Sequence, residues 1–217
     1  MIQTAEARWF YRRSTPPEVR SWFCGSSLCR EEDARTDHYL LLTGSNEVGV
    51  KVRGGEKFEI KARTAAPEPL MLLNGASVGF GDAWVKWTLE DCDAAARMSE
   101  VGSGSSEWIP VVKQRWLRKF LLDPTGQIEE VDADAAIDHG GRAELGQISA
   151  RDSQWWTVAF ESFGETNRTA NLELVARHFL RTLPRGLVLR ERDSMAYPEW
   201  LNRLAAGPDV TGAAPAV

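Results

Sequence analysis

The chain has 217 residues, of which 43% are hydrophobic and 26% charged, a composition typical of a folded globular protein rather than a disordered one. Its 31 acidic residues outnumber the 26 basic ones, and the net charge of -5 argues against general nucleic-acid binding and against attraction to an anionic membrane. Three cysteines are too few for a disulfide framework, no stretch is apolar over the roughly 18 residues of a membrane span, and the N-terminus does not resemble a secretory signal. We therefore expect a cytoplasmic protein.

Most of the chain predicts strands joined by short, glycine-containing turns. In chain order we expect a strand over 4–11, a short helix over 16–23, strands over 37–42, 47–53, 57–63 and 82–89, a short helix from Asp91, strands over 108–121, 127–131, 144–149 and 154–161, a helix over 169–181 and a last helix from Pro198. This pattern predicts an α+β fold, an antiparallel sheet with a few helices packed on it. We expect a single domain over 1–205, followed by a disordered tail over 206–217 that has little to pack.

Several of these strands have one apolar face and one charged face. In the strand over 47–53, three valines share one face, whereas Lys51 and Arg53 share the other. The charged faces either lie in solvent on a half-exposed sheet or line a closed barrel, and both arrangements are compatible with the pattern. In a barrel the bases would converge on one cavity suited to a polyanion, because arginine binds phosphate through a planar fork and lysine acts as a point charge. The bases expected to do so are Lys51, Arg53, Lys61, Arg63, Lys86, Lys113 and Arg115.

Four short segments, in this order along the chain, carry a resemblance to a known family. They are Asp37-His38-Tyr39-Leu40, the hairpin from Gly49-Val50-Lys51-Val52-Arg53 to Phe58-Glu59-Ile60-Lys61-Ala62-Arg63, Val112-Lys113-Gln114-Arg115, and Trp156-Thr157-Val158-Ala159-Phe160-Glu161 before an amphipathic helix. Together they resemble the CYTH domain of the triphosphate tunnel metalloenzyme superfamily. The resemblance implies an antiparallel tunnel of about eight strands that binds a triphosphate-containing or polyphosphate ligand. It also implies hydrolysis of a phosphoanhydride bond with Mg²⁺ or Mn²⁺.

The first strand departs from the family pattern Glu-x-Glu-x-Lys. It reads Glu6-Ala7-Arg8-Trp9-Phe10, so an arginine replaces the second glutamate and a phenylalanine replaces the lysine. The resemblance suggests Glu6 and Glu161 as metal ligands, but a cation beside a metal site weakens Mg²⁺ binding by repulsion. If another strand supplies the missing carboxylate, the candidates are Glu59, Glu144 and Glu161.

Three functions stay open at this point. The first is a metal-dependent, triphosphatase-like hydrolase, and the second is a polyanion- or nucleotide-binding module without turnover, in which Glu6 and Glu161 form salt bridges with tunnel arginines such as Arg8. The third, a barrel that holds an apolar ligand, is disfavoured by the charged faces, because such a cavity is lined by apolar side chains.

Overall fold

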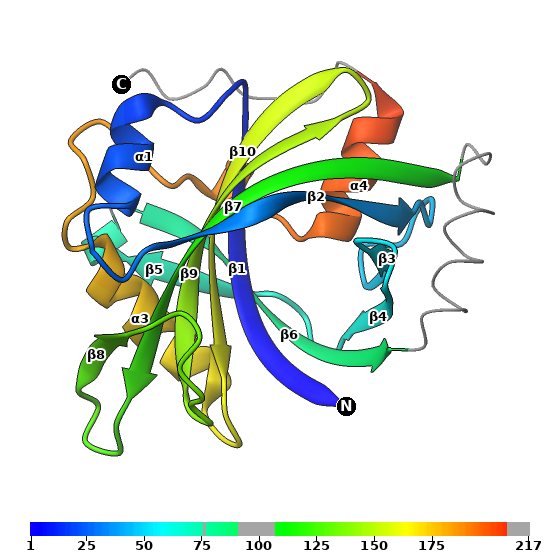
Figure 1. Cartoon of the computed structure of the whole chain (residues 1–217). Helices are drawn as coiled ribbons and strands as arrows, with labels where there is room; N and C mark the ends of the chain where they lie inside the picture. The colour runs from blue at the N-terminus through cyan, green and yellow to red at the C-terminus, as the bar shows by residue number, and fades with distance from the viewer. Residues whose placement is uncertain (76, 91–106, 208–217) are drawn as a thin grey trace.

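A closed, eight-stranded antiparallel barrel forms the centre of the molecule (Figure 1). The computed structural model describes residues 1–75, 77–90 and 107–207. Around the barrel the strands follow the order β1-β10-β9-β7-β2-β3-β4-β6, and β6 pairs with β1 to close the ring. The barrel strands are β1 (Ile2–Arg12), β2 (Arg30–Leu40), β3 (Val48–Arg53), β4 (Lys57–Arg63), β6 (Ser77–Leu89), β7 (Trp108–Leu122), β9 (Gly140–Ala150) and β10 (Ser153–Phe163).

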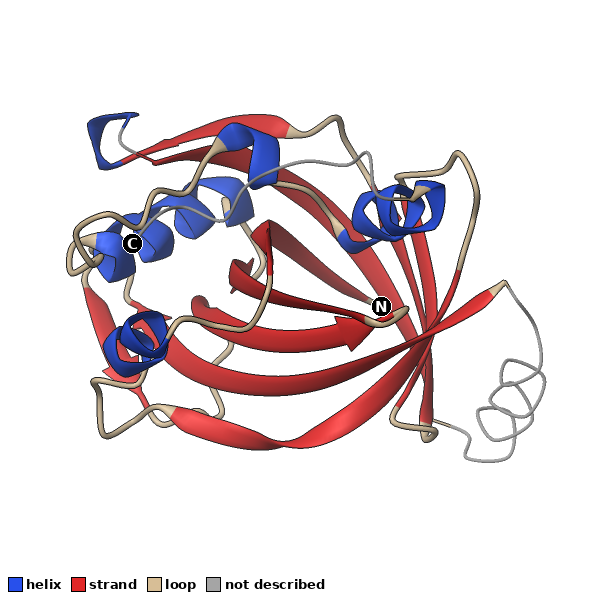
Figure 2. Ribbon diagram, turned by 90° about the horizontal axis from the view of Figure 1, so that it is seen from above, coloured by secondary structure: helices blue, strands red, loops and turns tan. Residues whose placement is uncertain are grey.

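The remaining elements extend or cover this barrel. Two short strands, β5 (Glu68–Leu72) and β8 (Ile128–Val131), pair with the ends of β6 and β7. The helices are α1 (Pro17–Phe23), α3 (Arg168–Leu180) and α4 (Tyr197–Ala206), with 3-10 turns at Leu73–Gly75 and Glu191–Asp193. Seen from above, the strands curve around a common axis and the helices lie outside them (Figure 2). The predicted α+β barrel is therefore confirmed, whereas the helix predicted from Asp91 and the tail from residue 208 lie outside the described residues.

The larger apolar core lies outside the barrel wall, under α1 and α3. Every second residue of β1 points outward, and the small side chains of Ala5 and Ala7 let α3 pack closely over β1, β9 and β10. Phe179 of α3 contacts Phe23 and Phe160, with ring centroids 5.2 and 5.6 Å apart. These outward faces are apolar because a helix covers them, which leaves the inward faces free to carry charge.

The inside of the barrel is apolar at one end, where α4 packs across it. Phe10 of β1 faces inward, and its ring stacks on Trp200 of α4 with centroids 5.0 Å apart and an interplanar angle of 11°. Trp155 of β10 meets the edge of Trp200 at 5.9 Å. Inward-facing residues of β2, β7 and β9 complete this second core, so aromatic packing fills one end of the barrel and the charged residues occupy the rest. Among the described residues, no helix is both long and apolar enough to span a bilayer.

Candidate functional site

The barrel encloses a chamber of about 180 Å³ with charged walls. Among the described residues, nine basic and six acidic side chains line it. With the carboxylate of Asp37, which binds three of these bases from behind the wall, the excess is two positive charges in a chain whose net charge is -5. The basic residues are Arg8, Arg35, Lys51, Arg53, Lys61, Lys86, Lys113, Arg115 and Arg142, and the acidic ones are Glu6, Glu32, Glu59, Asp82, Glu144 and Glu161. A space of this size holds roughly six water molecules, so a small anion can replace water there.

Six of the seven predicted bases line this chamber, and they come from four strands. They are Lys51 and Arg53 on β3, Lys61 on β4, Lys86 on β6, and Lys113 and Arg115 on β7. The seventh, Arg63, is not among the lining residues. Its Nε lies 2.9 Å from Asp82 Oδ1, and its guanidinium lies 5.2 Å from the centroid of the Trp84 ring. The register places Arg63 opposite Trp84 of β6, so the ring and the carboxylate hold its side chain against the wall.

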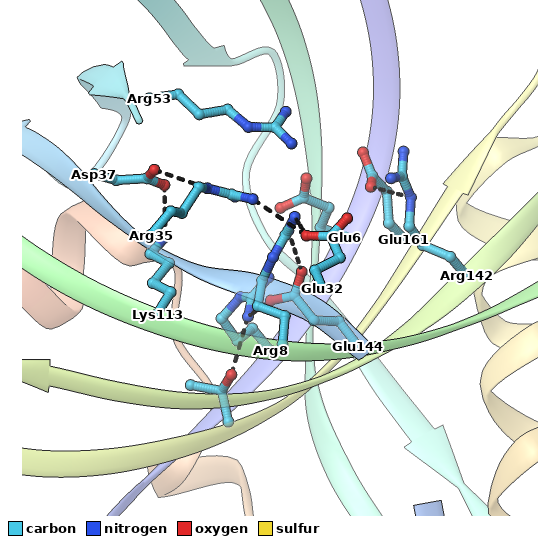
Figure 3. Close-up of polar contacts among 12 residues, drawn as sticks. Glu6, Arg8, Glu32, Arg35, Asp37, Arg53, Lys113, Arg142, Glu144 and Glu161 are labelled. Carbon is cyan, nitrogen blue, oxygen red and sulfur yellow. Dashed lines mark hydrogen bonds and ion pairs between the residues drawn. The ribbon is translucent and has the colours of Figure 1, made fainter. Parts of the chain in front are cut away.

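A fully buried carboxylate, Asp37, binds three cations towards the α4 end of the chamber, and Figure 3 shows two of them, Arg35 and Lys113. Its Oδ1 accepts a hydrogen bond of 3.0 Å from Arg35 Nε, and its Oδ2 lies 3.2 Å from Lys113 Nζ and 3.5 Å from Lys51 Nζ. Burial alone raises the pKa of a carboxyl group, but the three cations outweigh it and hold the pKa of Asp37 well below its ordinary value. Asp37 therefore stays ionised and fixes these cations in place.

Lys113 lies beside a stacked pair of aromatic rings at the inner end of the chamber. Its Nζ is 4.7 Å from the centroid of Tyr39 and 4.1 Å from that of Tyr197, and it donates a short hydrogen bond to the Tyr39 hydroxyl. The two tyrosine rings stack with centroids 5.1 Å apart. Arg8 lies over the same Tyr197 ring at 5.0 Å. Because Tyr197 begins α4, the helix that closes the barrel also supplies part of the chamber wall.

Glu144 joins the two sides of the chamber by binding two arginines. Its Oε1 accepts from Arg8 Nη1 and its Oε2 from Arg115 Nη1, each at 2.8 Å, and Arg115 also donates to Glu32 (Figure 3). Burial raises the pKa of Glu144, but Arg8 and Arg115 outweigh that effect and hold it well below its ordinary value. Arg8 thus forms one half of a buried ion pair with Glu144.

The two predicted metal ligands are neighbours across the strands. Glu6 of β1 lies opposite Glu161 of β10 on one side and opposite Asp82 of β6 on the other, so three carboxylates form a row. Each of the three already has a cation. Glu6 pairs with Lys61, and Asp82 pairs with Arg63. The third carboxylate, Glu161, has its Oε2 atom 2.8 Å from Arg142 Nε.

This row does not fit a resident divalent ion. A Mg²⁺ or Mn²⁺ site needs several carboxylate or carbonyl oxygens directed at one point, whereas these carboxylates are directed at separate cations. Across the part of the chain that the structure describes, no group of three His, Cys, Asp or Glu side chains is arranged to hold a metal. Burial, together with the charge of Glu6, raises the pKa of Asp82 to about 6 against the lowering effect of Arg63.

A second hollow, of about 520 Å³, adjoins the chamber at the end away from α4. The two spaces share Lys86, Arg142 and Glu161 as lining residues. The outer hollow is less uniformly charged, because the apolar side chains of Ile2, Leu117, Ile137 and Phe163 line it together with charged ones such as Arg118 and Lys119. The chamber therefore passes from a charged interior to a partly apolar vestibule.

Several lining residues were not predicted from the sequence. Arg142 lies two residues before Glu144 on β9, so alternation along this strand would have identified it, had the strand been extended to its observed start. Arg35 lies two residues before Asp37, but the predicted strand began at Asp37 and missed it. Tyr197 gives no such signal, because its place in the wall depends on how α4 docks.

No protein-family model matches the chain, and no curated protein matches it in sequence. Among solved structures, the chain is similar to a protein from Pyrococcus horikoshii OT3, with 12% identity, a TM-score of 0.44, and 89% of this chain and 98% of that one covered. It is also similar to a conserved hypothetical protein from Pyrococcus furiosus, with 11% identity, a TM-score of 0.45 and the same coverage.

Proposed function

We propose that the chamber binds a triphosphate-containing or polyphosphate ligand, and that the chain is a divergent member of the CYTH superfamily. The observation that carries this proposal is the convergence of nine basic side chains on one chamber, with an excess of two positive charges once Asp37 is counted. Such an excess is costly in a confined space, because like charges repel, and a polyanion would offset it. The tunnel fold and the resemblance of four segments support the same ligand class.

Hydrogen-bond donors without acceptors also favour an anionic ligand. The Nε atom of Arg115 is buried and forms no hydrogen bond, although the two Nη atoms of the same guanidinium do. Lys86 forms no ion pair with any residue that the structure describes. Buried donors are normally satisfied, so groups of this kind in a cavity wall indicate acceptor oxygens that a ligand or water supplies. Phosphate oxygens are well matched to guanidinium and ammonium donors.

The outer vestibule favours a ligand that carries an organic group. Its apolar side chains adjoin the charged chamber, with Lys86, Arg142 and Glu161 between the two spaces. A phosphate chain in the chamber would place an attached base or other organic group against Ile2 and Phe163. Inorganic triphosphate has nothing to bury there, so we expect a nucleoside triphosphate or a similar ester to bind more tightly.

The family resemblance predicts hydrolysis with Mg²⁺ or Mn²⁺ held by Glu6 and Glu161, and this prediction requires that both carboxylates exchange their present cations for the metal. The ion pairs of these two carboxylates with Lys61 and Arg142 favour the second candidate, a binding module without turnover. A cation already neutralises each carboxylate, so a divalent ion would have to displace it.

One experiment separates these functions. The protein is incubated with inorganic triphosphate, polyphosphate or nucleoside triphosphates, each with Mg²⁺, with Mn²⁺ or with a chelator, and phosphate release and thermal stability are measured together. A ligand present at 100 times its Kd stabilises the folded state by about 2.7 kcal/mol, which a thermal shift detects. Stabilisation without release identifies a binding module, and metal-dependent release identifies a hydrolase. If no phosphate compound stabilises the protein or is hydrolysed, the proposed function is wrong.

A further inference from the structure

Two thiols face each other on the outer side of the barrel, and neither belongs to the residues that line the chamber. Cys24 directly follows α1 and Cys29 directly precedes β2, and their Sγ atoms lie 3.2 Å apart. Both residues are free cysteines and half-buried. The backbone of the connecting loop is folded in turns: Cys24 N–H donates to the Arg20 carbonyl at 2.9 Å, and Cys29 N–H donates to that of Ser26 at 3.1 Å.

Packing on both sides holds the two sulfurs together. Cys24 and Cys29 both pack against the outer apolar core. Phe23, the residue before Cys24, is buried against Phe179 of α3. Arg118 of β7 donates a hydrogen bond from Nη1 to the Phe23 carbonyl oxygen at 3.4 Å, and this contact connects the end of α1 to the barrel wall. The short distance between the thiols is thus set by the fold around them.

A metal site does not account for this pair. Structural zinc takes four ligands, and no third His, Cys, Asp or Glu joins these two thiols within the described part of the chain. Two thiols in contact without a metal have one chemistry available to both at once, which is oxidation to a disulfide.

We propose that Cys24 and Cys29 form a reversible redox site that takes a low-molecular-weight disulfide, such as glutathione disulfide, as its oxidant. The Cys24 thiolate attacks one sulfur of the oxidant, which forms a mixed disulfide and releases one thiol. Cys29 then loses its proton and attacks the Cys24 sulfur, which releases the second thiol and leaves the Cys24–Cys29 disulfide. Two protein thiols are oxidised while one small disulfide is reduced to two thiols, so electrons and protons balance.

The hydrogen bond between the thiols sets the order of these two steps. Cys29 donates to Cys24, and burial together with this bond raises the pKa of Cys29 to about 12. Cys29 therefore stays protonated in the reduced protein, and Cys24 attacks first. Once Cys24 is in the mixed disulfide, Cys29 is the neighbouring sulfur that resolves it.

The disulfide would close a loop of six residues between α1 and β2. A crosslink of this length restricts the unfolded chain, and for a protein of this size we expect oxidation to raise the Tm by about 4–9 °C. This readout is independent of phosphate binding, so the redox proposal and the proposed function can fail separately.

The test uses the full chain with Cys92→Ser, since the third cysteine lies outside the described residues. The folded protein is equilibrated in glutathione buffers of increasing disulfide content, quenched with acid and analysed by peptide mass spectrometry. We expect a Cys24–Cys29 crosslink, loss of both titratable thiols, the rise in Tm, and full reversal by dithiothreitol. Cys29→Ser should stop at a glutathione adduct on Cys24, whereas Cys24→Ser should form no adduct under the same conditions.

Two outcomes would overturn the proposal. The first is a folded protein that keeps both thiols at every glutathione ratio. The second is a crosslink that forms in urea but not in the folded protein, since the geometry described above would then play no part. The parent protein alone decides both, so the proposal stays testable even if a serine variant fails to fold.

Discussion

Arg53 offers a direct test of phosphate binding, because its removal should disturb the fold little. Its side chain is 37% exposed, and its nearest carboxylate oxygen, Glu59 Oε1, is 3.7 Å from Nη1, which is too long for a hydrogen bond. Glu59 keeps a second cation, because Lys51 Nζ lies 3.0 Å from its Oε2. Arg53→Ala therefore strands no buried charge, and the free energy of unfolding should change by no more than about 0.5 kcal/mol.

The expected loss of affinity follows from the contact that the guanidinium would make. A hydrogen bond to a charged group contributes about 1.5–3 kcal/mol, and each 1.4 kcal/mol corresponds to a tenfold change in Kd. Arg53→Ala should accordingly raise the Kd for a triphosphate by about 10- to 150-fold. Arg115 would be a poorer choice, because it binds Glu144 and Glu32, and its loss would leave each carboxylate with only one of its two arginines.

Isothermal titration calorimetry at one fixed ionic strength measures this change, since exposed charges are screened by salt. Arg181→Ala is the matched control, because it removes the same charge from an exposed position at the end of α3. An unchanged Kd for Arg53→Ala would refute the assignment of Arg53 to the ligand. An equal loss in Arg181→Ala would show that net charge, and not the chamber, sets the affinity.

Three further predictions concern the stability of the chamber. Glu144→Ala leaves Arg8 and Arg115 without their shared carboxylate, so the free energy of unfolding in urea should fall by about 3–5 kcal/mol. A change of less than about 1 kcal/mol would contradict the proposed ion-pair role of Glu144. Burial raises the pKa of Asp82 to about 6, above its unfolded value, so between about pH 4 and 6 the folded state binds more protons than the unfolded state. The free energy of unfolding should therefore decrease by something on the order of 3 kcal/mol as the pH rises through this range. Asp82→Asn should lack this fall, and a variant that retains it would assign the effect to another group. Trp200→Ala removes the ring that fills the end of the barrel, so the free energy of unfolding in urea should fall by about 3–5 kcal/mol. Trp200→Phe keeps a smaller ring and should lose less. Equal losses for the two variants would mean that ring volume is unimportant there.

Alternation along the strands was enough to predict most of the chamber. In a strand the side-chain period is two, so Lys51 and Arg53, or Lys113 and Arg115, must share a face once the strand is identified. The opposite faces are apolar, which left the closed barrel as one of two arrangements, and the structure confirms it. The same rule places Glu6 and Arg8 inside the barrel, because they lie four and two residues from the inward-facing Phe10 and so share its face of the strand.

Other features had no such signal. Residues 30–36 form the first half of β2 but read as a polar segment, because their inner face is charged and a bulge between Glu32 and Arg35 interrupts the register. The strand β5 (Glu68–Leu72) is short and includes a proline, so its composition did not predict a strand. The direction of the Arg63 side chain and the position of Tyr197 depend on contacts between distant segments, which no local pattern encodes.

The packing of α4 across one end of the barrel has a consequence for long ligands. A chain-like polyanion could not thread through, because Phe10, Trp155 and Trp200 fill the far end. It would have to approach from the vestibule with its terminus first and withdraw by the same route. Its last few units would then meet Lys113, while internal units stayed outside. The affinity for such a polymer would therefore depend on the concentration of chain ends and not on chain length. Short and long chains supplied at the same molar concentration of ends would compete equally for the site.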